Sequence, residues 1–187
     1  EVEQGEKLTD KQKSYHQKTK VRDLALLTLL LGTGIRVSEC VGLNIADIDF
    51  KNGGIRIYRK GGKEVTVYFG TEVEDALLDY LEERDRIIPE KGHEDALFLS
   101  LQRRRMAVRS VENLVKKYAR IVSPLKPITP HKLRSTYGTN LYRETGDIYL
   151  VADVLGHSDV NTTKRHYAAL EDERRRSARN KVRLREK

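Results

Sequence analysis

The sequence predicts a mainly helical α+β fold with one small antiparallel sheet. Apolar residues recur at helical spacing through most of the chain, and capping residues and glycines separate these segments. Only segments 54–59 and 64–69 alternate apolar and polar residues as strands do, and the Gly-Gly pair between them predicts a hairpin. The 187 residues suffice for one buried core and favour a single domain.

The first helix is expected to be buried. Residues 21–31 (VRDLALLTLLL) are apolar on nearly every side, and two glycines follow them closely. Residues 1–20 are polar, so we expect a linker or the frayed start of this helix. A short helix should follow within 35–43, with Arg36 and Glu39 on one face because they are three residues apart.

The remaining helices are predicted from their caps and apolar spacing. Proline after a threonine cap favours a helix start, and aspartate is a strong N-cap. The expected helices are 72–88 capped by Thr71, 111–122, one from Thr129-Pro130 to about Thr145, one from Asp147 to Leu155, and one that starts at Asp159 and contains Tyr167. The Arg-rich segment 171–187 is compatible with a further helix.

Composition narrows the class of protein. A net charge of +8 and a pI near 9.5 favour a polyanionic partner, most commonly nucleic acid. A single cysteine, Cys40, excludes an internal disulfide and favours a reducing, cytoplasmic setting. No apolar run is long enough for a membrane span, and no signal peptide is recognisable. The only methionine is Met106, so we expect a fragment of a larger protein.

Six residues could together cut a phosphodiester without a metal or another cofactor. Such a reaction needs a nucleophile, cationic donors for the charge that develops on phosphate, and an acid for the leaving oxygen. Predicted helix and turn ends carry the cationic and acidic groups, and a tyrosine follows them: Arg36, Lys60, His131, Arg134, His157 and Tyr167.

These residues stand in motifs that resemble the catalytic domain of the tyrosine recombinase, or phage integrase, family over about residues 19–170. The motifs are GTGIRVSE at 32–39, the hairpin lysine Lys60, HKLR at 131–134, LGH at 155–157, and Tyr167 in RHYAAL. Each motif alone is weak, but their order and spacing together are specific. Tyr167 follows His157 by ten positions, one more than the commoner family spacing, which in a helix turns a side chain by roughly 100° and predicts a local rearrangement.

The resemblance implies a role for each residue. Arg36 and Arg134 would hold the non-bridging phosphate oxygens, and Glu39 would orient this shell. Lys60 would protonate the leaving 5′ oxygen, with Lys63 as the alternative acid. His131 would take the tyrosine proton, His157 would donate a hydrogen bond to the phosphate, and Tyr167 would form a 3′-phosphotyrosyl bond.

The family also implies partners and boundaries. The expected substrate is double-stranded DNA with a specific recombination site, joined by a homotetramer on two duplexes, for integration or excision of a mobile element. We expect residues 21–170 to form the catalytic domain and 171–187 to pass to a neighbouring protomer. Accessory DNA-bending or directionality factors are further partners, and the setting is cytoplasmic and nucleoid-associated. Further DNA contacts are predicted at Lys63, Arg103, Arg104 and Arg105.

Two other functions stay open on the residues alone. A DNA-binding module that does not cut would use the same charge, and a type IB topoisomerase-like or telomere-resolving enzyme would use the same chemistry. Individually, Arg36 with Glu39 could be a helix ion pair, Lys60 and Lys63 soluble turn residues, and Tyr167 a core tyrosine.

Overall fold

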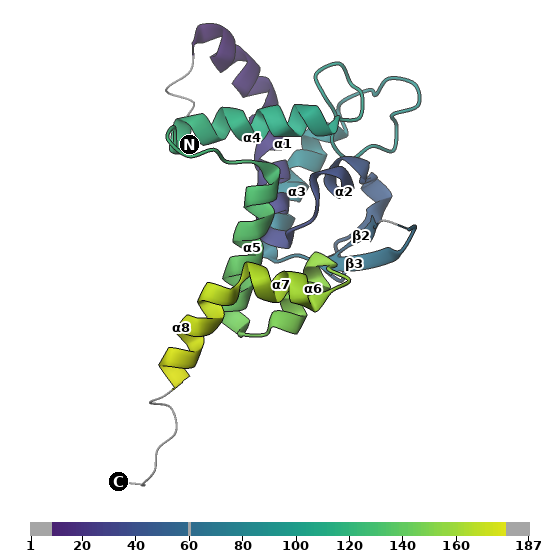
Figure 1. The fold of residues 1–187 in the computed structure, drawn as a ribbon. Coiled ribbons are helices and arrows are strands. Elements are labelled where there is room, and N and C mark those ends of the chain that lie inside the picture. The colour runs from purple at the N-terminus through teal and green to yellow at the C-terminus, as the bar shows by residue number, and fades with distance from the viewer. Residues whose placement is uncertain (1–8, 60, 179–187) are drawn as a thin grey trace, which may run out of the picture. The chain divides into compact units, whose positions relative to one another are not determined.

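A computed structural model describes residues 9–59 and 61–178 of the chain (Figure 1). The chain forms two compact units, 1–137 and 138–187, and the boundary between them falls inside helix α5. The predicted class is confirmed, since the described residues form mainly helices together with one three-stranded antiparallel sheet. The elements are α1 (Asp10–Thr33), α2 (Val37–Gly42), the 3₁₀ turn η1 (Ile45–Asp47), β1 (Ile48–Asp49), β2 (Gly54–Tyr58), β3 (Glu64–Tyr68), α3 (Thr71–Arg84), α4 (Val108–Val122), α5 (Pro130–Thr145), α6 (Ile148–Leu155), α7 (Val160–His166) and α8 (Ala168–Ala178).

Helix α1 begins at Asp10, eleven residues before the apolar segment that predicted it. Its polar first half is nevertheless partly buried, because His16 and Thr19 are 2% and 0% exposed. The Thr19 hydroxyl donates to the carboxylate of Asp23, one turn further along the helix. Residues 10–20 therefore belong to the helix, and residues 1–8 lie outside the described part of the chain.

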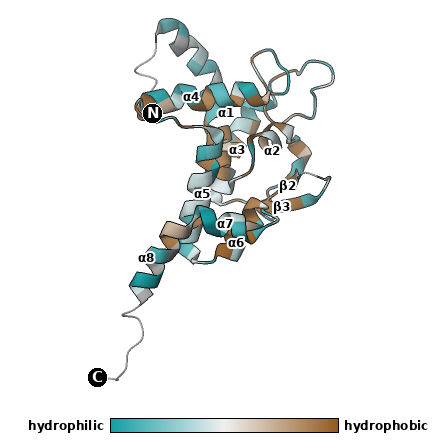
Figure 2. Cartoon of the chain, viewed as in Figure 1, coloured by the Kyte–Doolittle hydropathy of each residue, from teal (hydrophilic) through white to brown (hydrophobic). Residues whose placement is uncertain are grey.

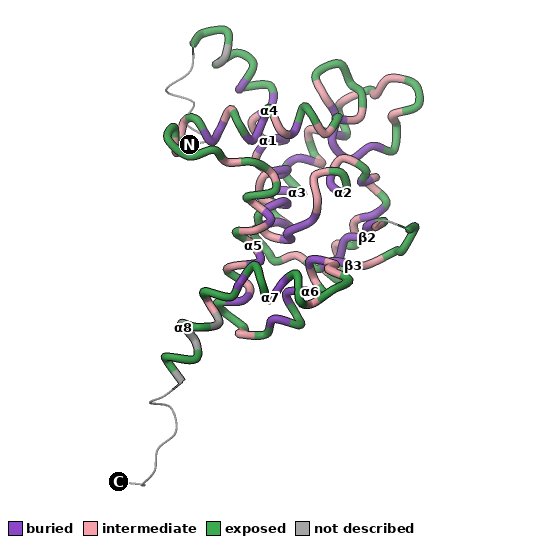
Figure 3. The backbone as a smooth tube through the Cα atoms, in the orientation of Figure 1, coloured by how far each residue is buried: buried purple, intermediate pink, exposed green. Residues whose placement is uncertain are grey.

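The core of the first unit forms between α1, α3 and the sheet. Helices α1 and α3 lie side by side, and Figure 3 shows buried backbone along both and along β2. Leu26, Leu29 and Ile55 are fully buried there. Tyr80 stacks on Phe98 with ring centroids 5.3 Å apart, so the segment after α3 also closes this core.

The predicted hairpin is confirmed, with one strand more than the sequence indicated. The strand order is β1-β2-β3, and Ile55 pairs with Val67 while Ile57 pairs with Val65. Ile55 and Ile57 of β2 face the core, and Arg56 between them faces solvent, as the period of two requires. Strand β1 has only two residues, too few to carry a recognisable pattern.

Both ends of α3 and the start of α4 differ from the prediction. Gly70, and not Thr71, is the N-cap of α3, and Thr71 is its first residue. The helix ends at Arg84 because the buried guanidinium of Arg84 donates to the carbonyls of Glu94 and Ala96, which draws the following chain across the helix end. Helix α4 begins three residues earlier than predicted, and Figure 2 shows its apolar and polar residues alternating along the helix.

No helix in the described ranges is long and apolar enough to cross a membrane.

The second unit contains the end of α5 and helices α6 to α8. Asp147 caps α6 by accepting from the backbone of Tyr149 and Leu150, as predicted. Gly156 ends α6 with a φ of +65°, a conformation that favours glycine. Asp159 caps α7 as expected, but the helix ends at His166, so the prediction that it contains Tyr167 was wrong. Tyr167 lies between α7 and α8, and its side chain joins the unit's small core with Tyr142, Ile148, Val151, Ala152 and Leu155.

Candidate active site

The two arginine motifs of the first unit meet at the turn after α1. Gly34 has a φ of +65° there, and the Arg134 guanidinium donates to the Gly34 carbonyl over 2.5 Å. An added Cβ at Gly34 would overlap the Tyr137 ring, so this position needs glycine for its backbone and for space. Arg36 follows only two residues later. Residues a hundred positions apart in the sequence are thereby brought to one turn.

Glu39 organises this turn. Arg36 is the N-cap of α2, its backbone N–H donates to Glu39 Oε2 over 2.7 Å, and its Nη1 donates to Oε1 over 3.0 Å. The Glu39 side chain is 4% exposed, whereas that of Arg36 is 41% exposed. Arg59, at the end of β2, places Nε 3.7 Å from the same Oε1. The carboxylate is thus buried between two guanidinium groups, while Arg36 still faces solvent.

The hairpin loop carries the two candidate lysines. Lys60 lies outside the described residues, so its predicted role stays a prediction. Lys63 is exposed, and its carbonyl accepts the Arg59 N–H over 2.9 Å. Gly61 and Gly62 have φ values of +85° and +76°, which explains why two glycines stand at this turn.

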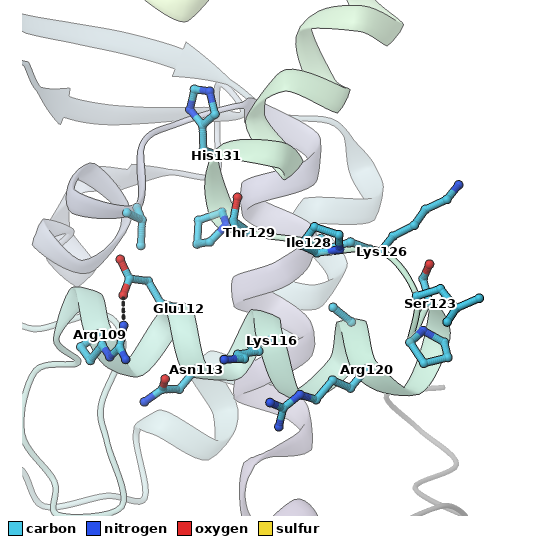
Figure 4. Close-up of a pocket in the computed structure, with 16 residues that line it drawn as sticks. Arg109, Glu112, Asn113, Lys116, Arg120, Ser123, Lys126, Ile128, Thr129 and His131 are labelled. Carbon is cyan, nitrogen blue, oxygen red and sulfur yellow. Dashed lines mark hydrogen bonds and ion pairs between the residues drawn. The ribbon is translucent and has the colours of Figure 1, made fainter.

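His131 is exposed on the first turn of α5, one helical turn before Arg134. It stands at one end of a groove of about 670 Å³, which Val37 also lines. Figure 4 shows α4 along one side of this groove and the segment from Ser123 to Thr129 along another.

Helix α4 gives the groove a cationic side that the sequence analysis missed. Arg109, Lys116 and Arg120 are exposed and line the groove, and Lys126 joins them from the following loop. Arg109 donates to Glu112, as the dashed line in Figure 4 marks. The spacing 109, 116, 120 repeats on one face of a helix, and this periodicity was the signal available in the sequence.

The arginines predicted to contact DNA have three different surroundings. Arg104 is exposed. Arg103 pairs with Glu90 and has a φ of 61°. Arg105 donates to the carbonyls of Val41 and Leu43 and to the Asn44 side chain. These bonds attach the segment before α4 to the end of α2, and a phosphate would have to compete with them for Arg105.

In the second unit, Thr163 connects the remaining two candidates. His157 Nδ1 lies 2.6 Å from the Thr163 hydroxyl, and the Tyr167 N–H donates to the Thr163 carbonyl over 3.1 Å. Thr163 is completely buried and His157 is partly exposed. Sequence reasoning missed this threonine, which lies one helical turn before the tyrosine.

The Tyr167 side chain is buried within its own unit. It is 3% exposed, packs against the rings of Tyr142 and His166, and places its hydroxyl against the backbone of Gly138 in α5. An added Cβ at Gly138 would overlap that hydroxyl. A phenol in this position is closed off from solvent.

The candidate residues therefore form two described groups. Arg36, Glu39, His131 and Arg134 belong to the first unit, and His157 and Tyr167 to the second. In the first unit, Arg134 bonds to the backbone of Gly34 and Arg36 pairs with Glu39; in the second, Thr163 contacts His157 through its hydroxyl and Tyr167 through its carbonyl. The convergence of both groups on one phosphate stays a prediction.

Comparison with known proteins agrees with the motifs. The sequence pattern of the phage integrase family matches residues 1–174. Tyrosine recombinase XerD of Oceanobacillus iheyensis is 38% identical over 148 residues, which are 79% of this chain and 50% of that protein. The chain spans about half the length of the curated relatives it matches.

Solved structures share the fold. XerH site-specific recombinase bound to its difH substrate, in a post-cleavage complex, has a TM-score of 0.74 and 25% identity, over 86% of this chain and 46% of that one. The Tn1549 transposon integrase in complex with circular intermediate DNA has a TM-score of 0.64 and 25% identity, over 89% and 64%. The chain belongs to the phage integrase family and corresponds to the catalytic domain of a tyrosine recombinase.

Proposed function

We propose that this domain cleaves and rejoins DNA at specific sites through a 3′-phosphotyrosyl bond at Tyr167. The observation that supports this most is the meeting of the two arginine motifs, where Arg134 binds the Gly34 carbonyl two residues before Arg36. Two guanidinium groups at one turn can donate to the same phosphate, and their fixed planar geometry suits its oxygens. Their charge would stabilise the pentacoordinate transition state.

The other residues complete the proposed reaction. His131 accepts the Tyr167 proton, the phenolate oxygen bonds to phosphorus, and the bond from phosphorus to the 5′ oxygen breaks. Lys60, or Lys63 in its place, gives that oxygen its proton, and His157 donates to the phosphate. The phosphotyrosyl bond keeps the energy of the cut bond, so another 5′ hydroxyl reverses the step without a cofactor.

Double-stranded DNA is the proposed substrate, held in part by the cationic side of the α4 groove. Arg109, Lys116, Arg120 and Lys126 present exposed charge within one surface, as phosphate binding requires. The structures of XerH and of the Tn1549 integrase hold DNA, which supports this substrate by likeness.

The proposed biological role is integration or excision of a mobile element. The likeness to a transposon integrase supports this role, and the higher identity to XerD supports a Xer-type reaction as the second candidate. A homotetramer on two duplexes, linked through 171–187, is part of the same proposal. Residues 168–178 are helical, a form suited to docking on a neighbour, and 179–187 lie outside the described part.

Trapping of the covalent intermediate tests the proposal. The full-length protein is incubated with a nicked suicide duplex, whose site is first selected by binding from a library of randomised duplexes, and the products are separated under denaturing conditions. We expect a protein–DNA adduct that Tyr167→Phe abolishes. Tyr149→Phe is the matched control, since Tyr149 is 62% exposed in the same unit, and it should retain the adduct. An adduct that persists in Tyr167→Phe would show that the nucleophile is another residue.

A further inference from the structure

Glu39 places a buried negative charge directly beside Arg36. Glu39 Oε1 lies 3.0 Å from Arg36 Nη1, and Oε2 accepts the Arg36 backbone N–H over 2.7 Å. The Glu39 side chain is 4% exposed, so water weakens its attraction to Arg36 less than it would at the surface. A carboxylate in this place orients the guanidinium, but it also offsets the positive charge that a phosphate would meet there.

Arg59 adds a second guanidinium to the same carboxylate. Its Nε lies 3.7 Å from Glu39 Oε1, and its side chain is 10% exposed, whereas that of Arg36 is 41% exposed. The hairpin fixes the backbone of Arg59, because its N–H donates to the Lys63 carbonyl and its carbonyl accepts the Gly62 N–H. A turn needs no guanidinium held inside the protein, so this side chain requires an explanation beyond the turn.

We propose that Arg59 is a positioning residue, which balances the charge of Glu39 and so leaves the charge of Arg36 available to the scissile phosphate. The proposal rests on the proposed function, in which Arg36 donates to the non-bridging oxygens. Two guanidinium groups and one carboxylate leave one positive charge in excess, and Arg36 is the most exposed of the three side chains. Arg59 acts through Glu39 without touching the DNA. Its effect is greatest in the transition state, where negative charge gathers on the phosphate oxygens.

An uncharged phosphate separates this role from a merely structural one. In a methylphosphonate duplex, a methyl group replaces one non-bridging oxygen of the scissile phosphate, which then carries no charge. The reaction is otherwise the same, since the tyrosine oxygen bonds to phosphorus and the 5′ oxygen leaves with a proton. Loss of positive charge beside the phosphate should therefore slow cleavage of the natural duplex far more than cleavage of the methylphosphonate duplex. A variant that is merely misfolded slows both alike.

Single-turnover cleavage of matched phosphodiester and methylphosphonate suicide duplexes by the full-length protein tests the proposal. We expect Arg59→Gln to slow the phosphodiester duplex by about 10-fold, less than the roughly 10²- to 10³-fold of a donor in direct contact, and to stay within about 3-fold of wild type on the methylphosphonate. Arg56→Gln is the matched control, because Arg56 on β2 pairs with another buried carboxylate, Asp47, at 3.1 Å. It should cleave both duplexes like wild type. Equal slowing of both duplexes by Arg59→Gln, or no slowing at all, would overturn the proposal.

A double-mutant cycle shows whether Arg59 acts through Glu39. Once Glu39→Gln has removed the buried charge, Arg59 has nothing left to balance. Adding Arg59→Gln to Glu39→Gln should therefore slow the phosphodiester duplex by less than about 2-fold, however strongly Glu39→Gln acts on its own. A further loss of about 10-fold in this background would overturn the proposal, because Arg59 would then act on the DNA or on the fold without Glu39.

Two more variants complete the test. Arg59→Lys keeps the charge and should stay within about 3-fold of wild type on both duplexes. If Arg59→Gln does not fold, as judged by circular dichroism, Arg59→Lys decides, since a loss of about 10-fold on the phosphodiester duplex would overturn the proposal. Arg36→Gln reports on the proposed function separately, because a wild-type rate would show that Arg36 holds no phosphate. A selective loss on the phosphodiester with Arg36→Gln but not with Arg59→Gln overturns only the role of Arg59.

Discussion

Thr163 joins His157 to the backbone of Tyr167, and its hydroxyl holds the imidazole of His157. Thr163→Val keeps the shape of the side chain but removes the oxygen that lies 2.6 Å from His157 Nδ1. Because a hydrogen bond of this kind contributes about 1 kcal/mol, we expect adduct formation to slow by roughly 5-fold. The rate of adduct formation on the suicide duplex measures the effect, and nitrogen-15 NMR of the imidazole reports its tautomer.

The control for this change is Thr163→Ser, which retains the hydroxyl and loses only a methyl group. It should keep the histidine tautomer and most of the cleavage rate, although the lost methyl creates a small cavity in a fully buried site. Wild-type cleavage by Thr163→Val would contradict a positioning role for this threonine. Loss of cleavage with an unchanged imidazole spectrum would contradict it as well.

Individual site residues were predictable from the sequence to the extent that a motif marks them. The spacing predicted Arg36 and Glu39 on one face of a short helix; they do pair at 3.0 Å, but Arg36 is the N-cap of α2 and lies outside the helix. The contacts of Thr163 and Arg59 had no such marker, because only the fold brings their partners close. Neither a threonine in a helix nor an arginine at a turn differs from ordinary surface residues until its partner is known.

At the scale of elements, a buried polar cluster ties α1 to α4. Asp23 is 1% exposed and accepts hydrogen bonds from Thr19, Arg22 and Tyr118, while His16 lies 3.2 Å from the Tyr118 hydroxyl. Burial, together with the Asp23 carboxylate, raises the pKa of Tyr118, so this phenol remains a donor at physiological pH. The cluster explains why a polar segment without helical apolar spacing becomes the first three turns of α1.

Asp23→Asn should release this part of α1. The change leaves the buried Arg22 charge without its carboxylate, and we expect the free energy of unfolding to fall by about 3 kcal/mol. Tyr118→Phe removes one donor and should cost about 1 kcal/mol. Urea unfolding measures both values, and hydrogen exchange should show faster opening of residues 10–20.

Asp10→Asn is the matched control for the cluster, because Asp10 lies at the start of the same helix with its side chain fully exposed. Its effect should remain within about 0.5 kcal/mol. If Asp23→Asn were equally mild, the buried ion pair would contribute nothing to the attachment of α1, and another contact would have to account for it.

Helix ends were predicted correctly where a capping residue or a glycine in the local sequence sets them. Caps and glycines correctly located α5, α6 and the start of α7. Boundaries set by tertiary contacts were missed. Arg84 ends α3 by bonding to a distant carbonyl, and the chain bends at Tyr167 as its ring enters the core of the second unit. No single-sequence pattern records those contacts.

At the scale of the whole molecule, the division into two units puts the proposed nucleophile and the arginine pair on different units. The proposed chemistry therefore requires residues of both units at one phosphate, which motif order alone does not specify. Because the chain divides into two units, the first unit can have an unfolding free energy of its own. The only cysteine of the chain offers a direct probe, because Cys40 lies in the core of that unit.

Cys40 should report the unfolding of the first unit without any introduced label site. The thiol is completely buried, and burial raises its pKa to about 12, so almost no thiolate exists at pH 8. On unfolding the pKa returns to about 8.5 and the thiol becomes reactive. We expect iodoacetamide to label the native protein only at the rate of unfolding, and urea to accelerate labelling in step with the loss of helical circular dichroism.

The matched control uses the same short helix. Ser38 is exposed two residues before Cys40, so Ser38→Cys places a thiol in α2 that needs no unfolding to react. Mass spectrometry should find the cysteine at 38 modified at once and Cys40 protected in the same molecule. Rapid labelling of Cys40 without urea would mean that α2 opens on its own. In that case the turn that joins Arg36 to Arg134 would not be a rigid platform for a phosphate, and the arginine pair would have to be assembled by DNA.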